Sequence, residues 1–145
     1  MIITAMKEEE HWDYMIRTAE CVWSPTARGI VVLDHNMLPC AGVMFDMWCP
    51  NSGQVHIAIT NPLAIRAGFV NEGFRYFFDE CDKEVMIGVT PAHAAKALKF
   101  NKKVGLREVY RIKDGFTQGI DLIVQEIRKD ECRWINHGQE YSSAA

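Results

Sequence analysis

The chain has 145 residues, of which 48% are hydrophobic and 24% are charged, and its formal net charge is −3. This length fits a single globular domain. A net negative charge argues against direct binding of nucleic acid, because nucleic-acid-binding proteins usually carry a basic excess or stripe. No apolar run approaches the roughly 18 residues of a membrane span, and the N-terminus does not resemble a secretory signal. We expect one domain over residues 1–135, followed by a polar tail over residues 136–145.

The cysteine content bears on metals and on location. The five cysteines are Cys21, Cys40, Cys49, Cys81 and Cys132. An odd number without C-x-x-C spacing fits neither a disulfide framework nor a zinc site. The histidines and carboxylates show no metal-binding motif either. We therefore expect reduced thiols, no bound metal and a cytoplasmic location.

The first half of the chain predicts one helix and four strands. Strands are expected at residues 2–6, 30–33, 40–45 and 55–59. Between the first two strands, residues 7–22 predict a helix whose apolar face carries Trp12, Met15, Ile16 and Ala19. In the strand at 55–59, apolar Val55, Ile57 and Ile59 alternate with His56 and Ala58.

In the second half, helices and strands alternate. Apolar residues recur every four positions from Ile65 to Cys81 and predict an amphipathic helix of about four turns, with its aromatic residues in the core. A strand at 84–89 leads to a helix at 92–104, which ends at Gly105. A strand at 106–111 and a last strand at 121–127 follow, and the Asp114-Gly115 pair predicts a hairpin turn between them.

This order of elements predicts an α/β (α+β) domain. We expect a mixed, mostly antiparallel sheet of about seven strands, with a central parallel β-α-β crossover and helices on both faces. The helices at 65–81 and 92–104 should lie on opposite faces, or at least in separate layers. The strands at 2–6 and 122–127 are expected at the edges, where copies of the chain could pair into a homo-oligomer.

The element order and the last helix resemble the GNAT N-acetyltransferase superfamily. That family's last helix has the pattern N-x-x-A-x-x-F-Y-x-K-x-G-F, and five residues here fall in register: Ala97, Phe100, Lys103, Gly105 and Leu106. The resemblance implies a cleft for acetyl-CoA between the strands at 55–59 and 84–89, which should be parallel neighbours that separate at their C-terminal ends. It also implies that the last helix, with Phe100, lines this cleft, and that Gly105 has a positive φ.

The family holds the cofactor pyrophosphate with a loop of the pattern Q/R-x-x-G-x-G/A, whose free backbone N–H groups face the phosphates. The equivalent residues here include Arg66, Ala67 and Gly68, and Ile65 and Val70 replace residues that the pattern specifies. Arg66 either pairs with phosphate or is an ordinary surface arginine. We expect weak cofactor binding, because the bulkier side chains crowd this loop.

Acetyl transfer to an amine requires a group that accepts a proton from the amine and a donor that polarises the thioester carbonyl. The resemblance places that donor in the backbone near Ala58 and Ile59. The candidate bases are His56 and Asp46, although each also fits a structural role. Asn101 stands where the family has a tyrosine that protonates the departing thiolate, and an amide cannot serve as a general acid.

Three functions remain open. The first is an N-acetyltransferase that uses acetyl-CoA and an amine of unknown identity. The second is a non-catalytic structural or interaction protein with protein partners, like the small internal virion proteins among the degenerate phage-encoded members, which would act in the host cytoplasm or the virion. The third is a CoA-binding or acyl-binding regulator without turnover. Fold alone does not decide among them.

Overall fold

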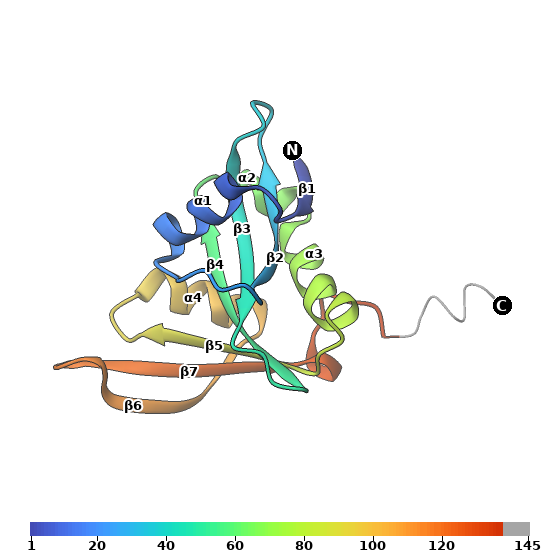
Figure 1. Ribbon diagram of the computed structural model, residues 1–145. Coiled ribbons are helices and arrows are strands. Elements are labelled where there is room, and N and C mark those ends of the chain that lie inside the picture. The colour runs from blue at the N-terminus through green and yellow to red at the C-terminus, as the bar shows by residue number, and fades with distance from the viewer. Residues whose placement is uncertain (138–145) are drawn as a thin grey trace.

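The computed structural model describes residues 1–137 and contains a seven-stranded sheet with helices on both faces (Figure 1). The strand order is β1-β2-β3-β4-β5-β7-β6, and only β4 and β5 pair in parallel. This confirms the predicted mixed sheet. In chain order the elements are β1 (Ile2–Ala5), α1 (Glu9–Ala19), β2 (Arg28–Leu33), β3 (Pro39–Asp46), β4 (Ser52–Ile59), α2 (Leu63–Arg66), α3 (Phe69–Arg75), the π-helix η1 (Tyr76–Glu80), β5 (Val85–Pro91), α4 (Ala95–Val104), β6 (Arg107–Thr117), β7 (Ile120–Arg128) and the 3₁₀ helix η2 (Lys129–Glu131).

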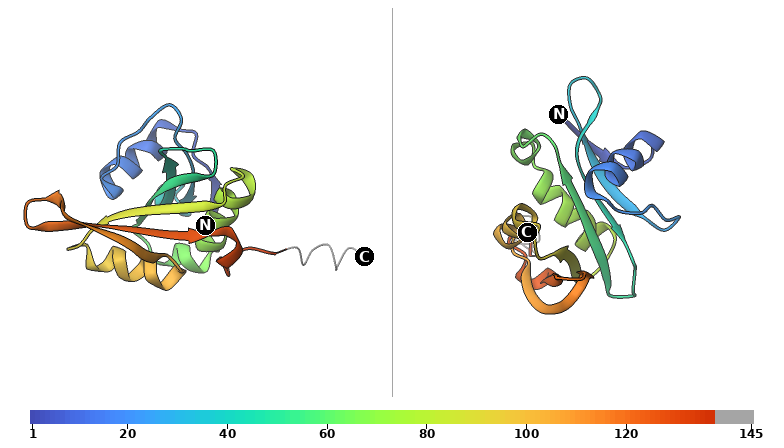
Figure 2. Two further views of the ribbon diagram at one scale, coloured as in Figure 1. Left: turned by 90° about the horizontal axis from the view of Figure 1, so that it is seen from below. Right: turned by 90° about the vertical axis from the view of Figure 1, so that its left-hand side faces the viewer.

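Each face of the sheet has its own apolar cluster. The smaller cluster joins Tyr14 and Met15 of α1 to β2, β3 and β4. The larger one joins α3 and η1 to the opposite face, and Val104 of α4 belongs to it as well. The prediction that the helices at 65–81 and 92–104 occupy opposite faces is therefore wrong: α3 and α4 lie together, and α1 alone covers the other face (Figure 2).

Helix α1 is rotated relative to its predicted apolar face. His11, Tyr14 and Met15 are its buried residues, whereas Ile16 is 39% exposed. His11 is buried because Nδ1 accepts hydrogen bonds from the backbone N–H groups of Lys7 and Glu8, both at 3.3 Å. Capping of the helix start thus turns a polar side chain inward, which the apolar spacing alone did not indicate.

The helix predicted over residues 65–81 is divided into three parts. Gly68 has φ +94° and separates α2 from α3, and the chain then widens into the π-helix η1. Three consecutive aromatic residues, Tyr76, Phe77 and Phe78, are all buried there. One stripe of a regular α-helix cannot bury three consecutive residues so completely, and a wider π turn spreads them over the sheet.

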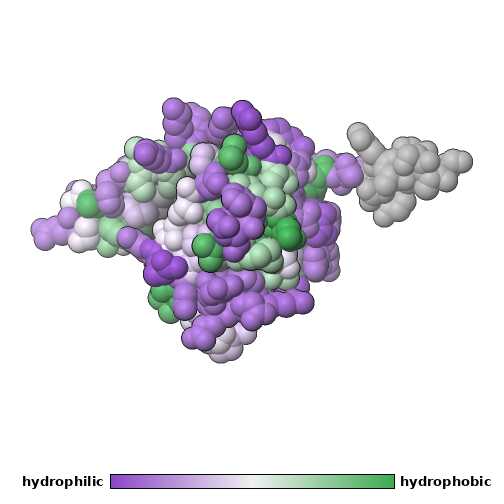
Figure 3. All heavy atoms as spheres, turned by 90° about the horizontal axis from the view of Figure 1, so that it is seen from above, coloured by the Kyte–Doolittle hydropathy of each residue, from purple (hydrophilic) through white to green (hydrophobic). Residues whose placement is uncertain are grey.

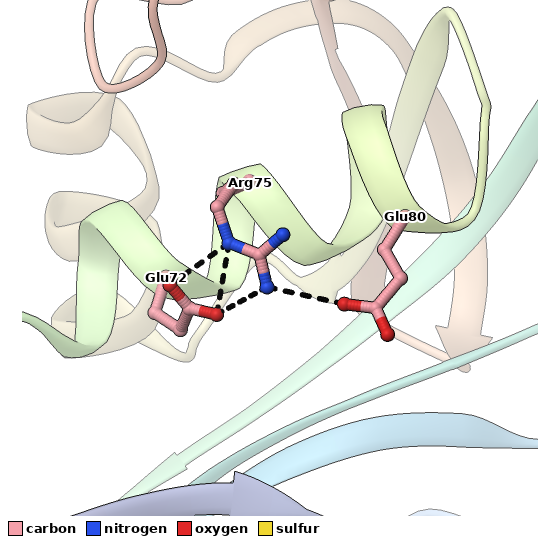
Figure 4. Close-up of polar contacts among 3 residues, drawn as sticks. All are labelled: Glu72, Arg75 and Glu80. Carbon is pink, nitrogen blue, oxygen red and sulfur yellow. Dashed lines mark hydrogen bonds and ion pairs between the residues drawn. The ribbon is translucent and has the colours of Figure 1, made fainter.

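The π turn also creates an ion-pair network on the solvent side of this helix (Figure 4). Arg75 pairs with Glu72 on the preceding turn and with Glu80, five residues later, at 3.1 Å. A separation of five residues matches the i→i+5 hydrogen-bond spacing of a π-helix. The three charges therefore bridge the junction between α3 and η1.

Helix α4 ends as predicted. Gly105 has φ +116°, and the N–H groups of Gly105 and Leu106 both donate to the carbonyl of Asn101, at 3.2 and 2.9 Å. The indole of Trp134 donates to the carbonyl of Val104 at 2.8 Å, so a segment after β7 also satisfies this helix end.

The last hairpin differs from its prediction in two ways. Its turn lies at Gln118 and Gly119, not at Asp114-Gly115. Asp114 instead adopts φ +54° within β6, and its carboxylate accepts the N–H of Gly119 at 2.8 Å. In addition, β7 lies between β5 and β6, so the edge strand is β6 and the expectation of an edge at 122–127 is wrong.

Residues 1 and 137, the two ends of the described part of the chain, are exposed. Figure 3 shows the molecule from above relative to Figure 1, and on this face hydrophobic groups are interspersed with hydrophilic ones. After η2, Ile135 still packs against the larger cluster, and the His137 ring lies 2.7 Å from the carbonyl oxygen of Cys132. Of the tail expected at 136–145, residues 138–145 lie outside the described residues.

Candidate active site

The central feature of the site is a separation of β4 from β5. The two strands pair only through Ser52–Gln54 of β4 and Val85–Ile87 of β5, although β4 continues to Ile59 and β5 to Pro91. The expected parallel neighbours that separate at their C-terminal ends are thus confirmed. Backbone groups beyond this point face a gap instead of a neighbouring strand.

The register shows which backbone groups of β4 face that gap. Thr60 N–H donates to the Cys40 carbonyl at 2.9 Å, and Val85 N–H donates to the Asn51 carbonyl at 3.1 Å. Because bonding alternates along an antiparallel strand, even-numbered residues of β4 bond to β3 and odd-numbered residues face β5. The N–H of Ile59 therefore points toward the gap, and the N–H of Ala58 points toward β3. The Ala58 side chain is buried against the α1 side.

A cleft of about 310 Å³ opens at this gap. Five elements contribute to its wall: the end of α1 (residues 18–20), β4 (55–57), β5 (88–91), the start of α4 with the preceding loop (His93, Ala94, Ala97, Asn101) and Phe116 of the last hairpin. Because the residues on β4 and β5 alternate between the two faces, the cleft receives side chains from both sides of the sheet.

The two candidate bases, His56 and Asp46, form a pair. His56 Nε2 lies 2.8 Å from Asp46 Oδ1, and the side chains are 21% and 13% exposed. His56 lies opposite Met44 and Asp46 lies opposite Gln54, so the two side chains are diagonal neighbours on the α1 face of the β3–β4 pair. A carboxylate can only accept a hydrogen bond, so in the neutral imidazole Nε2 carries the hydrogen and Nδ1 has a lone pair. His56 also lines the cleft.

Asn101 belongs to a buried polar cluster on the α4 side of the cleft. Its Nδ2 donates to Gln125 Oε1 at 3.0 Å and to Thr90 Oγ1 at 3.4 Å. Asn101, Thr90 and Gln125 are 7%, 8% and 4% exposed. This arrangement holds the amide in one orientation, and Asn101 and Thr90 both line the cleft.

The mouth of the cleft carries two rings and an acid. The rings of His93 and Phe116 lie 5.5 Å apart, and Phe116 is half-exposed. Ala94, not His93, caps α4, and no side chain bonds to that cap. Glu20 lines the opposite side of the mouth, at the end of α1.

The remaining candidates lie on the α3–α4 side. Phe100 is partly buried and lines a narrow apolar crevice of about 30 Å³ between α3 and α4. Ile59 packs at the edge of the same apolar cluster. Arg66 and Ala67 are exposed at the end of α2, and the space beside Gly68, where a side chain would extend, is open. These residues are therefore separate from the pair of His56 and Asp46.

Unpaired positive charge lies on α2 and on α4, the helix whose Phe100 and Val104 line this crevice. Among the described residues, five cationic side chains of α2 and α4 form no hydrogen bond or ion pair: Arg66, Lys96, Lys99, Lys102 and Lys103. Most arginines elsewhere in the described part are bound to carboxylates or to aromatic rings. We call this set of five side chains the cationic face; it contrasts with the net negative charge of the protein.

Two further features concern metals and membranes. Within residues 1–137, no group of three or more His, Cys, Asp or Glu side chains is arranged to hold a metal ion. None of the helices in that part is both long enough and apolar enough to cross a bilayer. All five cysteines are free thiols, and only Cys49 is exposed.

Comparison with solved structures shows the fold. A chimera of the Vibrio cholerae spermidine N-acetyltransferase SpeG and hSSAT superposes with a TM-score of 0.74 at 13% identity, covering 94% of this chain and 100% of that chain. SpeG from Vibrio cholerae in complex with manganese ions gives a TM-score of 0.71 at 12% identity, covering 99% and 96%. The SpeG F149G mutant gives 0.72 at 14% identity, covering 94% and 98%. The chain has a GNAT-like fold. No protein-family model and no curated protein matches the sequence.

Within this GNAT-like fold, sequence reasoning missed several residues of the cleft. Gln125 lies inside the strand predicted at 121–127, Thr90 falls between the strand predicted at 84–89 and the helix predicted at 92–104, and Phe116 lies in the predicted hairpin turn. For Gln125, the available signal was a polar side chain inside a predicted strand. Glu20 was not predicted to line a cleft, because the predicted helix continued to residue 22. In the structure α1 ends at Ala19 and Glu20 adopts φ +52°.

Proposed function

We propose that the protein is an N-acetyltransferase that moves an acetyl group from acetyl-CoA to an amine. The observation that carries this proposal is the pair of His56 and Asp46 at the cleft formed where β4 separates from β5. Such a site supplies the two requirements of amide formation from a thioester: a base beside a gap, and free backbone donors along one strand.

The proposed reaction begins with the amine in its ammonium form. His56 Nδ1 takes one proton from the ammonium group, and Asp46 stabilises the imidazolium that forms. The amine nitrogen then attacks the thioester carbonyl, and the backbone N–H of Ile59 stabilises the oxygen that becomes negative. The carbon–sulfur bond breaks, the sulfur leaves as a thiolate, and the new amide loses its second proton to solvent.

The absence of a tyrosine at position 101 is compatible with this route. An ordinary thiol has a pKa of about 8.5, so its thiolate is a tolerable leaving group near neutral pH without a strong general acid. Asn101 would then contribute no proton. In this proposal His56 serves as the base, and no residue serves as the general acid.

Acetyl-CoA as donor is supported by the cationic face. Arg66 and the four lysines of α4 lie beside the crevice that Phe100 lines, and they have no protein carboxylate to neutralise them. CoA carries a pyrophosphate and a 3′-phosphate, and such groups pair with exposed lysine and arginine. Charge would thus replace part of the backbone cradle of the family pattern, from which Ile65 and Val70 depart.

The acceptor is proposed to be a cationic amine. Glu20 lines the cleft mouth and Asp46 lies behind His56, so negative charge faces the route by which the acceptor enters. The matched structures are named as spermidine N-acetyltransferases, which makes spermidine the first amine to try.

The test combines binding with transfer. Acetyl-CoA in hundredfold excess over its Kd should stabilise the fold by about 2.7 kcal/mol, a melting shift of about 6–10 °C. Mass spectrometry should then detect acetylated products from a panel of polyamines, monoamines and peptide amines. Binding without transfer would favour the CoA-binding regulator. A flat melting curve would overturn the proposal and favour the non-catalytic structural or interaction protein, such as an internal virion protein.

A further inference from the structure

Helix α1 carries more apolar surface than the rest of the domain covers. Its buried residues are His11, Tyr14 and Met15, whereas Trp12 is only partly buried and Ile16 is 39% exposed. Residues four apart are neighbours on one face of a helix, so Trp12 and Ile16 form an apolar stripe along the flank of α1. This stripe is available to a partner.

The loop after α1 adds a second tryptophan to the stripe. The rings of Trp12 and Trp23 meet edge to face with their centroids 6.4 Å apart, and Trp23 is 45% exposed. Cys21 anchors this loop, because it is buried in the smaller cluster and its thiol donates to the Met15 carbonyl at 3.5 Å. Tryptophan is enriched among the residues that contribute most to binding at interfaces, so an anchored and partly exposed pair indicates a docking surface.

Carboxylates without a partner border the stripe. Glu9 lies three residues before Trp12, which makes the two side chains neighbours on the helix surface. Asp13 has the same relation to Ile16, and Glu20 follows at the end of the helix. None of these three carboxylates forms a hydrogen bond or ion pair in the described part of the chain. The surface therefore combines negative charge with aromatic and aliphatic groups.

The stripe leads to the cleft. Ala19, three residues after Ile16, packs against the same cluster as Trp12 and also lines the cleft, next to Glu20. At 1.5 Å per residue, Trp12 and Ala19 lie about 10 Å apart along the helix, a distance that about three residues of an extended chain cover. A monoamine held at His56 does not reach the stripe, whereas a polypeptide that presents its amine there does.

These apolar and acidic side chains form one surface, which we call the α1 surface: Glu9, Trp12, Asp13, Ile16, Glu20 and Trp23. We propose that the α1 surface docks a basic segment of a polypeptide, and that an amine of this segment is the acceptor in the cleft. This inference rests on the proposed function for the transfer step, and it narrows the acceptor from any cationic amine to one borne by a polypeptide.

Charge and shape both favour this partner. Residues 8–20 hold five carboxylates against one arginine, Arg17, so they attract a basic segment. The cations of lysine and arginine are attracted to the faces of tryptophan rings. Apolar residues between those cations would cover the aliphatic part of the stripe and remove it from water. A ligand that offers charge alone leaves the stripe exposed.

The first test measures binding without acetyl-CoA. Three peptides with capped ends are titrated into the full-length protein by calorimetry: one alternates lysine with leucine, one replaces each leucine with serine, and one replaces each lysine with glutamate. We expect the lysine–leucine peptide to bind about threefold more tightly than the lysine–serine peptide, or better, and the glutamate peptide not to bind. Equal binding of the two lysine peptides, binding of the glutamate peptide, or binding of none overturns the docking surface.

Two substitutions and a matched control show which side chains take part. Trp23→Ser should weaken binding of the lysine–leucine peptide about tenfold, and Asp13→Asn about threefold. Glu10→Gln removes a carboxylate from the same helix, but Glu10 lies about 160° around the axis from Trp12, so binding should not change. All three substituted positions are exposed, and Asp13→Asn keeps the test decisive if Trp23→Ser fails to fold. Equal losses in Asp13→Asn and Glu10→Gln would indicate non-specific attraction and overturn the proposal.

Transfer kinetics then separate this inference from the proposed reaction. In Trp23→Ser the KM for the lysine–leucine peptide should rise about tenfold with kcat unchanged, and the KM for spermidine should stay the same. Peptide binding without acetylation of any amine overturns the reaction and supports the surface. Acetylation of spermidine in preference to the peptide keeps the reaction and overturns the inference. Self-association that disappears in Asp13→Asn would assign the α1 surface to the cationic face of a second copy, which also overturns it.

Discussion

His56 Nε2 and Asp46 Oδ1 lie 2.8 Å apart across the β3–β4 pair, and this contact fixes the imidazole in one tautomer. The opposite nitrogen is thereby left as the basic atom of a residue that lines the cleft. The two residues that the sequence offered as alternative bases therefore form one pair, in which Asp46 acts through His56.

The first prediction concerns this pair. His56→Gln should lower kcat for acetyl transfer by about 10²–10⁴, because general-base catalysis contributes a factor of that size. Asp46→Asn should lower it less, since the base remains but its tautomer is no longer held. His35→Gln, an exposed histidine in the β2–β3 turn, serves as the control and should leave kcat unchanged. An unaltered rate in His56→Gln would remove the base from the mechanism.

The second prediction concerns the cationic face. Lys99→Gln combined with Lys103→Gln should weaken acetyl-CoA binding and reduce its dependence on salt, because fewer charges attract the phosphates. Dephospho-CoA should lose less than CoA in the same variant. Lys113→Gln on β6 removes a charge far from the crevice and should have no effect. Salt dependence that is identical in wild type and variant would contradict the assignment.

The third prediction concerns the end of α4. Gly105→Ala should lower the free energy of unfolding by about 1–2 kcal/mol, because a side chain at φ +116° is strained. A Cβ there would also lie 3.0 Å from Ile127 Cδ1. Gly119 has φ +85° but open space around it, so Gly119→Ala measures the strain without the contact. Chemical denaturation of the two variants should show the larger loss for Gly105→Ala, and the reverse order would contradict it.

The fourth prediction concerns alkaline pH. Burial raises the pKa of four thiols above 9.0 and of two phenols above 10.0: Cys21, Cys40, Cys81, Cys132, Tyr14 and Tyr76. The unfolded chain releases these protons first, so folding stability is fully present below about pH 9 and declines as the pH rises above it. Urea unfolding between pH 7.5 and pH 10.5 should show this decline. Cys81→Ala should make the decline shallower, and a constant stability would refute the assignment.

Much of the fold followed from local patterns. Alternation and turn residues located the strands, and the glycine after α4 took the positive φ that its position required. The prediction of one continuous helix over 65–81 was wrong in its interior. Its apolar residues recur every four positions, more than the 3.6 residues per turn of an α-helix, and this spacing was a sign of the wide turn at η1. The prediction that α3 and α4 cover opposite faces of the sheet was wrong. Each helix is amphipathic by itself, and only tertiary packing decides which side of a sheet it covers.

The sequence indicated some residues of the candidate site but not their pairings. His56 and Asp46 were both candidates, but their contact depends on the β3–β4 register, which the sequence leaves open. Asn101 was singled out by its departure from a family pattern. Its partners Thr90 and Gln125 lie 11 and 24 residues away and come together only because β5, β7 and α4 are neighbours.

The edge strand β6 has a consequence for self-association. All eleven of its residues are exposed, and such an edge invites a second copy to extend the sheet. A two-fold axis perpendicular to the sheet places one residue opposite its own copy. With the axis at residue 108 or 111, Glu108 or Arg111 lies opposite its own copy. With the axis at 109, Arg107 lies opposite Arg111; at 110, Arg107 lies opposite Lys113; and at 112, Arg111 lies opposite Lys113. Each of these five registers therefore places two like charges opposite each other. The strand thus repels its own copy in each of these registers, and Arg111, which takes part in those centred on 109, 111 and 112, is the charge whose loss would most expose the edge to aggregation.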